Sequence, residues 1–211
     1  MKTNCKYIYP PRPETKIPPS SLDMFDKMNV YLAQPKLNGS SMEIYFNDNG
    51  EHLTYMNRHK ALISNMKMDK SELSALYRGT GKMILCGEYM NKACNDETGK
   101  LWNIKYVIWD IIMYNEEHLL RTTFDERYKL LCSLFPDNPA KKHLHYISEN
   151  CFRVNSVTTG FKKVYDDIIK YDMYEGLVQK RKDGKLENGT TAKNNVRTQL
   201  KCRKSTKNYN F

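Results

Sequence analysis

The segment VYLAQPKLNGSSMEIYF, residues 30–46, contains two predicted strands joined by a short loop. Over residues 41–46 apolar and polar side chains alternate, which is typical of a strand with one buried face. Residues 30–35 form the preceding predicted strand, and Lys36 and Gly39 fall between the two. The pattern therefore predicts that Lys36 lies in a loop, beside a glycine that allows the backbone to approach another group closely.

The rest of the chain mixes predicted strands and helices without a regular strand–helix–strand rhythm, which favours an α+β fold with antiparallel sheets. Residues 1–20 form a proline-rich N-terminal arm, predicted to be extended because proline fixes φ and lacks an amide donor. Further strands are predicted at residues 52–56, 82–90, 105–113, 174–180 and 198–202, and helices at residues 21–25, 64–77, 125–135 and 161–171.

Composition and charge limit the class of protein. A length of 211 residues suits one domain with a substantial core. The net charge of +10 favours a polyanionic partner such as a nucleic acid. The sequence has no apolar run of about 18 residues and no secretory signal, so we expect a cytoplasmic protein without a membrane span. The six cysteines form no C-x-x-C pair, which argues against a zinc site.

The tetrapeptide KLNG at residues 36–39 has the residue types for attack on a phosphate. A lysine is a nucleophile when its amine is neutral, and a nearby glycine lets the backbone approach a phosphate closely. A lone K-x-x-G is common by chance, and a loop lysine is ordinarily a solvated charge. The motif therefore has meaning only together with others.

Further short motifs follow KLNG along the chain. Each is weak alone, but five in order are hard to explain by chance. They are NR at 57–58, GE at 87–88, WD at 109–110, EG at 175–176 and KCR at 201–203. Over about residues 30–204 this order resembles the superfamily of ATP-dependent DNA ligases, RNA ligases and mRNA capping enzymes. The resemblance implies the nucleotidyltransferase fold, in which antiparallel sheets flanked by helices enclose a nucleotide pocket.

The resemblance also implies a role for each motif. Lys36 would attack ATP and carry AMP as a covalent adduct, with Lys201 and Arg203 as further catalytic residues facing the α-phosphate. Glu88 would accept a hydrogen bond from a ribose hydroxyl. Trp109 would stack on the adenine, with Tyr106 as the competing candidate. The implied nucleotide-binding residues are Gln34, Lys36, Leu37, Gly39, Arg58, Glu88, Trp109, Glu175 and Lys201.

The implied metal ligand is Glu175, which would hold Mg²⁺ or Mn²⁺ beside the α-phosphate. We expect a single adenylyltransferase domain over residues 1–211, without a C-terminal OB-fold domain. We also expect a monomer whose partners are the strand ends or nicks of RNA or DNA, located in the host cytoplasm if the source is viral.

Two departures from the family pattern bear on the substrate. DNA ligases and capping enzymes typically have K-x-D-G-x-R, whereas Asn38 and Ser41 occupy the Asp and Arg positions here. This is more similar to RNA ligases. The leading hypothesis is therefore an ATP-dependent RNA ligase that seals 5′-phosphate and 3′-hydroxyl ends. A DNA ligase is the first alternative, and a GTP-dependent capping guanylyltransferase or a non-catalytic nucleic-acid-binding module is the next.

Overall fold

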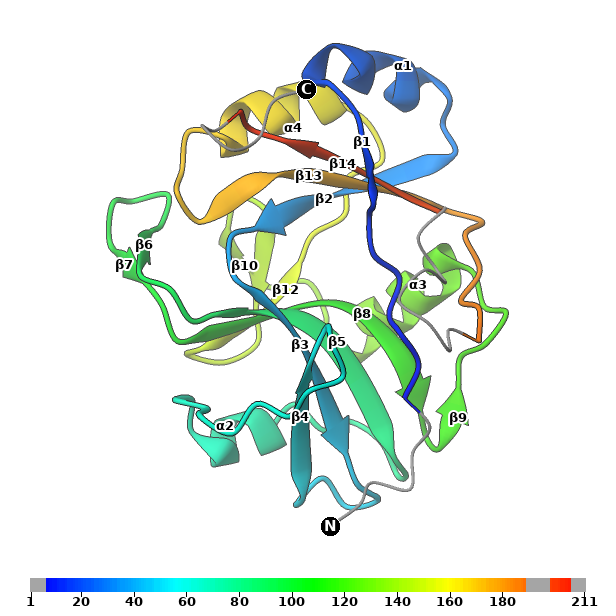
Figure 1. The fold of residues 1–211 in the computed structure, drawn as a ribbon, viewed down its shortest axis with the longest axis vertical. Coiled ribbons are helices and arrows are strands. Elements are labelled where there is room, and N and C mark those ends of the chain that lie inside the picture. The colour runs from blue at the N-terminus through cyan, green and yellow to red at the C-terminus, as the bar shows by residue number, and fades with distance from the viewer. Residues whose placement is uncertain (1–6, 189–197, 206–211) are drawn as a thin grey trace.

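Two β-sheets face each other across a central cavity in the computed structural model, which describes residues 7–188 and 198–205 (Figure 1). The smaller sheet has the strand order β1–β14–β13–β2. Its strands are β1 (Thr15–Lys16), β14 (Gln199–Arg203), β13 (Tyr174–Arg181) and β2 (Tyr31–Leu37). Strand β13 is antiparallel to both of its neighbours, whereas β1 runs parallel to β14.

The larger sheet has the order β10–β11–β12–β8–β5–β3–β4, with β9 paired to β8. All of its pairings are antiparallel except that of β12 with β8. Its strands are β3 (Ser40–Phe46), β4 (Leu53–Asn57), β5 (Met83–Met90), β8 (Lys105–Tyr114), β9 (Glu117–His118), β10 (Pro139–Lys141), β11 (Leu144–Tyr146) and β12 (Cys151–Val154). A separate hairpin pairs β6 (Cys94–Asn95) with β7 (Leu101–Trp102).

The helices lie on the outer faces of the two sheets (Figure 1). The 3₁₀ turn η1 (Pro19–Ser21), α1 (Leu22–Lys27) and α4 (Phe161–Ile168) cover the smaller sheet. The larger sheet is flanked by α2 (Lys70–Ser74) and α3 (Phe124–Leu134), and α3 begins with a Thr123–Glu126 capping box. Helix α3 is held to β8 by a buried ion pair, in which Arg127 donates to both oxygens of Asp110 at 3.0 and 3.1 Å.

The N-terminal arm connects the two sheets (Figure 1). At one end, Tyr7 and Ile8 are buried in a cluster with residues of β3, β5 and β8. At the other end, β1 extends the smaller sheet, because Thr15 pairs with Leu200 and Lys16 with Lys201. Over residues 7–16 the arm is therefore extended, as its prolines predict, and this stretch is held at both of its ends.

The α+β architecture agrees with the predicted fold class, but three local predictions are wrong. Lys36 lies in β2 rather than in a loop, since the strand continues to Leu37 and pairs with β13. The helix predicted at 64–77 covers only Lys70–Ser74, because residues 61–63 form hydrogen bonds back to β4 and the Asp69 side chain caps a later start. Two strand pairs are parallel rather than antiparallel.

Candidate active site

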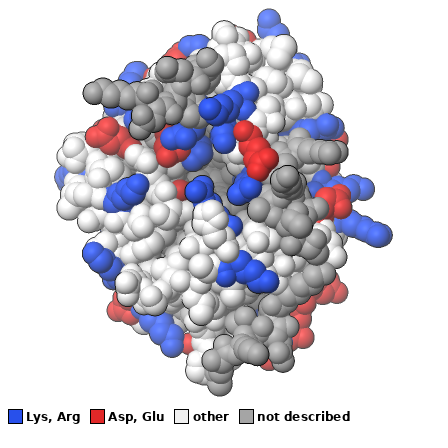
Figure 2. Space-filling model, in the orientation of Figure 1, with Lys and Arg blue, Asp and Glu red and all other residues white. Residues whose placement is uncertain are grey.

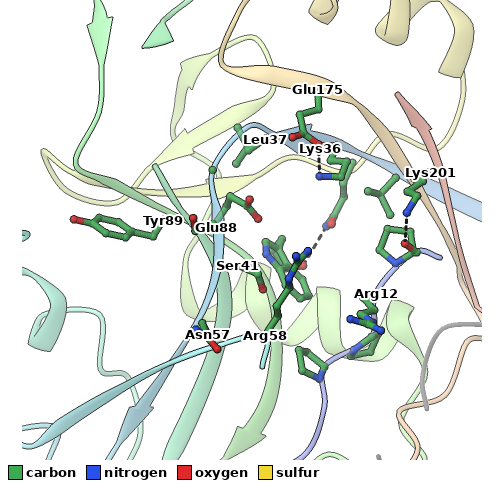
Figure 3. A pocket seen from close by; sticks show the side chains of 18 of the residues that line it. Arg12, Lys36, Leu37, Ser41, Asn57, Arg58, Glu88, Tyr89, Glu175 and Lys201 are labelled. Carbon is green, nitrogen blue, oxygen red and sulfur yellow. Dashed lines mark hydrogen bonds and ion pairs between the residues drawn. The ribbon is translucent and has the colours of Figure 1, made fainter. Parts of the chain in front are cut away.

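A cavity of about 980 Å³ lies between the two sheets and is lined by residues of both, together with the N-terminal arm (Figure 3). Lys and Arg side chains surround a hollow in this face of the molecule (Figure 2). All of the nucleotide-binding and catalytic residues expected from the sequence line this cavity. The short sequence motifs are thus brought together from strands that are far apart in the chain.

Lys36 extends from β2 and forms an ion pair with a carboxylate of the adjacent strand. Its Nζ is 2.5 Å from Oε2 of Glu175 (Figure 3). The Nε of Arg203 is 3.2 Å from the same oxygen. The side chains of Lys36 and Glu175 are 24% and 17% exposed, so both are partly desolvated and still reachable from the cavity. A lysine amine, a carboxylate and a guanidinium therefore share one point of the site.

The close approach of these strands depends on Gly176. This residue has φ +143°, a backbone conformation that only glycine adopts readily. A Cβ atom here would lie 2.0 Å from the backbone oxygen of Cys202. Gly176 pairs with Lys36 on one side and with Arg203 on the other, so it sets the spacing of the strands that carry the site.

Lys201 and Arg203 alternate along β14 and therefore point to the same face of the sheet. The Lys201 Nζ donates to the backbone oxygen of Pro13 in the arm at 3.2 Å (Figure 3). Partial burial lowers the pKa of Lys201, and the positive charges of Lys36 and Arg203 lower it further. Because these positive charges repel one another, the site favours an anionic ligand.

Glu88 projects from β5 on the opposite wall (Figure 3). Burial raises its pKa to about 7, although Lys36 and the backbone amide of Gly39 favour the charged form. A Cβ on Gly39 would lie 2.6 Å from the backbone oxygen of Tyr89 and 2.9 Å from the Glu88 side chain. Gly39 therefore permits the close approach of the β2–β3 turn to Glu88.

Trp109 lies at a β-bulge in β8. Gly87 pairs with Ile108 and Cys86 pairs with Asp110, so Trp109 has no partner on β5. Its backbone oxygen instead accepts from the side chains of Gln34, at 3.4 Å, and Lys180, at 3.2 Å. Bulges re-aim side chains, and this one leaves the indole lining the cavity and joins the two sheets through a single carbonyl.

The alternative prediction, that Tyr106 rather than Trp109 stacks on the adenine, is wrong. Its ring is fully buried against Gly87, where a Cβ would lie 2.4 Å from it. Its hydroxyl donates to the backbone oxygens of Met42 and Leu85 at 3.1 and 3.2 Å. Strand alternation together with the bulge directs Tyr106 into the core and leaves Trp109 in the cavity.

The Gln34 amide has a defined orientation. Its nitrogen faces the Trp109 carbonyl, which can only accept, and also lies 2.9 Å from the Ser156 hydroxyl. The Gln34 side-chain oxygen is buried and accepts from none of the described residues. Burying an acceptor without a partner is costly, so a donor placed beside this oxygen would stabilise it.

The remaining predicted residues differ in how directly they face the cavity. Leu37 is 3% exposed and belongs mainly to the core. Arg58 is exposed, with its Nε 3.0 Å from His59 Nε2. Ser41 lines the cavity, whereas the Asn38 side chain donates to the backbone oxygen of Asp172 at 3.3 Å. A carboxylate could not make that bond, so the Asn38 departure from the family pattern has a local structural explanation.

Two parts of the site were not among the site residues predicted from the sequence. Lys180 is buried, lies 4.6 Å from the centroids of both the Trp109 and Phe124 rings, and has a pKa lowered by burial to about 8. Regular alternation from Glu175 predicts residues 177 and 179 on the cavity face, whereas Val178 and Lys180 line the cavity, because the register shifts between Tyr174 and Gly176. Residues 9–14 of the arm also line the cavity, and no local sequence pattern places them there.

The donor set fits a divalent cation that arrives with a nucleotide. Within residues 7–188 and 198–205 no three His, Cys, Asp or Glu side chains are grouped to hold a metal ion by themselves. Mg²⁺ in nucleotide sites takes one or two carboxylates and completes its coordination with phosphate oxygens and water. Of the carboxylates that line the cavity, Glu14 pairs with Arg12, whereas Glu88 and Glu175, whose charges interact, are the candidates for this.

The fold and the grouped motifs define a nucleotidyltransferase domain of the ligase and capping-enzyme superfamily. A model of the family described as "ATP dependent DNA ligase domain" matches residues 16–198, and the chain belongs to this family. The comparison with curated proteins found no match. None of the helices among the described residues is long and apolar enough to cross a membrane.

Solved structures of DNA ligases share this fold. The mycobacterial DNA ligase D complexed with ATP and MES has a TM-score of 0.57 at 14% identity, covering 92% of this chain and 59% of that one. A Lig E DNA ligase has 0.53 at 14% identity, covering 93% and 70%. The Chlorella virus DNA ligase-adenylate has 0.50 at 16% identity, covering 92% and 69%. The chain thus spans less than two thirds of the mycobacterial ligase.

Proposed function

We propose that this chain is the adenylation domain of an ATP-dependent polynucleotide ligase and that Lys36 is its nucleophile. The observation that carries the proposal is the meeting of Lys36, Glu175 and Arg203 at one carboxylate oxygen, beside Lys201. The neutral Lys36 amine attacks the α-phosphorus of ATP. A nitrogen–phosphorus bond forms, the bond from the α-phosphorus to the bridging oxygen breaks, and pyrophosphate leaves.

The surrounding groups act on charge and position. Glu175 holds the Lys36 amine in place through the 2.5 Å contact and is the nearest acceptor for the proton that the ammonium must lose. Lys201 and Arg203 neutralise negative charge that builds up on the phosphate oxygens. A divalent cation, Mg²⁺ or Mn²⁺, held by Glu175 and the phosphates, would withdraw electron density from the phosphorus when bound.

Gln34 favours ATP over GTP, which argues against a capping guanylyltransferase. The base is proposed to lie on Trp109, next to the unsatisfied Gln34 side-chain oxygen. The exocyclic amine of adenine is a donor and would satisfy that oxygen. Guanine presents a carbonyl at the equivalent position, so the two oxygens would repel each other.

AMP then passes from Lys36 to a 5′-phosphate, and a 3′-hydroxyl displaces AMP to seal the strand. We propose nicked DNA as the first substrate, supported by the family to which the chain belongs. RNA ends are the second candidate. They are supported by Ser41, which lines the cavity where the family pattern has an arginine. We also propose that the protein is a monomer and that it is located in the cytoplasm. Size-exclusion chromatography with light scattering would test the first proposal, and fractionation of the source cells would test the second.

The adduct is the direct test. The protein is incubated with α-labelled ATP or GTP and Mg²⁺ or Mn²⁺, and then run on a denaturing gel. Label from ATP that disappears in Lys36→Ala is the expected result. Lys129→Ala is the matched control, because this lysine is 74% exposed on α3 and lies outside the cavity. Absence of label in the wild type, or full label in Lys36→Ala, refutes the mechanism. Sealing assays on nicked DNA, RNA and hybrid duplexes then rank the substrates.

A further inference from the structure

The N-terminal arm forms part of the cavity wall next to the phosphate-facing strand. The smaller sheet has the order β2–β13–β14–β1, so a line from Lys36 crosses Glu175, then Lys201, and ends at the arm. The arm is fastened there by the β1 pairing and by the Lys201 hydrogen bond to the Pro13 oxygen. Its position beside the site is therefore a fixed feature of the fold.

The opposite end of the cavity-lining segment is fastened as well. The Tyr7 hydroxyl donates to Oε1 of Glu43 at 2.9 Å, and Glu43 is only 1% exposed. Between the two anchors, Pro10, Pro11 and Pro13 restrict φ. A segment held at both ends and stiffened by proline loses little entropy when it binds a ligand.

Arg12 is the cation that this segment presents to the cavity. Figure 3 shows it on the same side as Lys201, across the cavity from Glu88. Its Nη2 donates to Oε1 of Glu14 at 2.8 Å, and its side chain is 33% exposed. Its Nε is buried and donates to none of the described residues. Part of the guanidinium is thus desolvated and has a donor to spare.

We propose that Arg12 binds the β- and γ-phosphates of ATP and stabilises the departing pyrophosphate, an inference that rests on the proposed function. With the α-phosphate at Lys36, the two remaining phosphates extend past Lys201 towards the arm. A guanidinium binds two phosphate oxygens at once, and the charge that it faces increases as the bond to the α-phosphorus breaks. No atom is transferred to Arg12, and the pyrophosphate leaves with both bonding electrons.

The proposal makes Arg12 specific to one step. Pyrophosphate is present when Lys36 is adenylylated and in the reverse reaction, but it is absent when a nick that already carries AMP is sealed. Arg12→Ala is therefore expected to lower kcat/KM for lysyl-AMP formation about ten- to hundredfold. The release of AMP from the adduct by added pyrophosphate should fall by the same factor. Sealing of a pre-adenylylated nick should stay within about twofold of wild type.

Arg181→Ala is the matched control. Arg181 also pairs with an aspartate two residues along the chain, Asp183 at 2.6 Å, but lies outside the cavity. Arg12→Lys retains the charge without the planar guanidinium and is expected to have an intermediate effect. It also provides a readout if Arg12→Ala does not fold, which a thermal melt would reveal.

Two results would overturn the inference while leaving the proposed function intact. One is a loss of pre-adenylylated nick sealing as large as the loss of adenylylation, because a purely structural arm would affect both steps. The other is adenylylation by Arg12→Ala at the wild-type rate. A wild-type protein that forms no adduct at all would instead refute the proposed function, and the inference with it.

Discussion

Replacing Glu43 by glutamine is expected to stabilise the protein at neutral and alkaline pH. Glu43 is buried in the larger sheet, where its two oxygens accept from Tyr7 at 2.9 Å and from Tyr45 at 2.7 Å. Burial raises its pKa from 4.5 to about 7, against the opposite effect of the two hydroxyls. The folded protein therefore holds a proton on Glu43 over a pH range in which the unfolded chain has lost it.

The sign and size of the effect follow from linkage. Between pH 4.5 and about 7 the native state binds more protons than the unfolded state, so the free energy of unfolding falls as pH rises. Above about pH 7 the free energy of unfolding has fallen by its full amount and no longer changes through Glu43. At about 1.4 kcal/mol per pH unit, the full difference is about 3 kcal/mol. Glutamine resembles the protonated acid and does not titrate, so Glu43→Gln should recover this amount at pH 8 and almost none at pH 4.5.

Urea denaturation of wild type and Glu43→Gln at several pH values between 4.5 and 8 measures the difference directly. A thermal melt at pH 8 should show a rise in Tm of about 6–12 °C. Glu51→Gln is the control, because Glu51 is exposed in the connection between β3 and β4 and should show no such pH-dependent gain. A Glu43→Gln variant that is equally or less stable at pH 8, or a difference that does not change with pH, would refute the reasoning.

Three further predictions concern the site. Gly176→Ala should lower the free energy of unfolding by more than about 3 kcal/mol in urea titrations, since its Cβ would lie 2.0 Å from the Cys202 oxygen at φ +143°. Trp109→Ala should raise the KM for ATP roughly 5- to 150-fold in adenylylation assays, whereas Trp109→Phe should retain most binding; equal effects would argue against stacking. Gln34→Leu should reduce the preference for ATP over GTP in adduct formation, and unchanged selectivity would mean that the Gln34 oxygen does not contact the base.

The strands of this fold were predictable where their patterns are local. The apolar run at residues 105–113 and the alternation at residues 41–46 correspond to β8 and β3. Lys36 was placed in a loop because β2 is completed by β13, which lies about 140 residues further along the chain. A local pattern ends where the local hydrophobicity ends, and it contains no information on such distant pairing.

The residues of the candidate site were likewise predictable only where the sequence carries a local motif. The motif residues were identifiable because each motif has a recognisable residue pair at a strand, and the fold then brought them to one cavity. Arg12 had no such signal, since Lys201 contacts the neighbouring Pro13 across 188 positions of sequence. The sequence analysis preferred Trp109 for stacking and kept Tyr106 as the competing candidate, and the bulge, which sequence periodicity does not reveal, separates their directions.

The extra residue at the β8 bulge also constrains how this chain can vary in length. If one residue were removed at Trp109, the register shift between Cys86 and Gly87 would disappear, whereas the shift between Ile84 and Leu85 would remain. The carbonyl that anchors Gln34 and Lys180 would then be lost, together with the indole. With β8 shortened, the larger sheet would be more regular, but the cavity wall would lack the Trp109 side chain. Substitutions at Trp109 should therefore be tolerated far better than deletions.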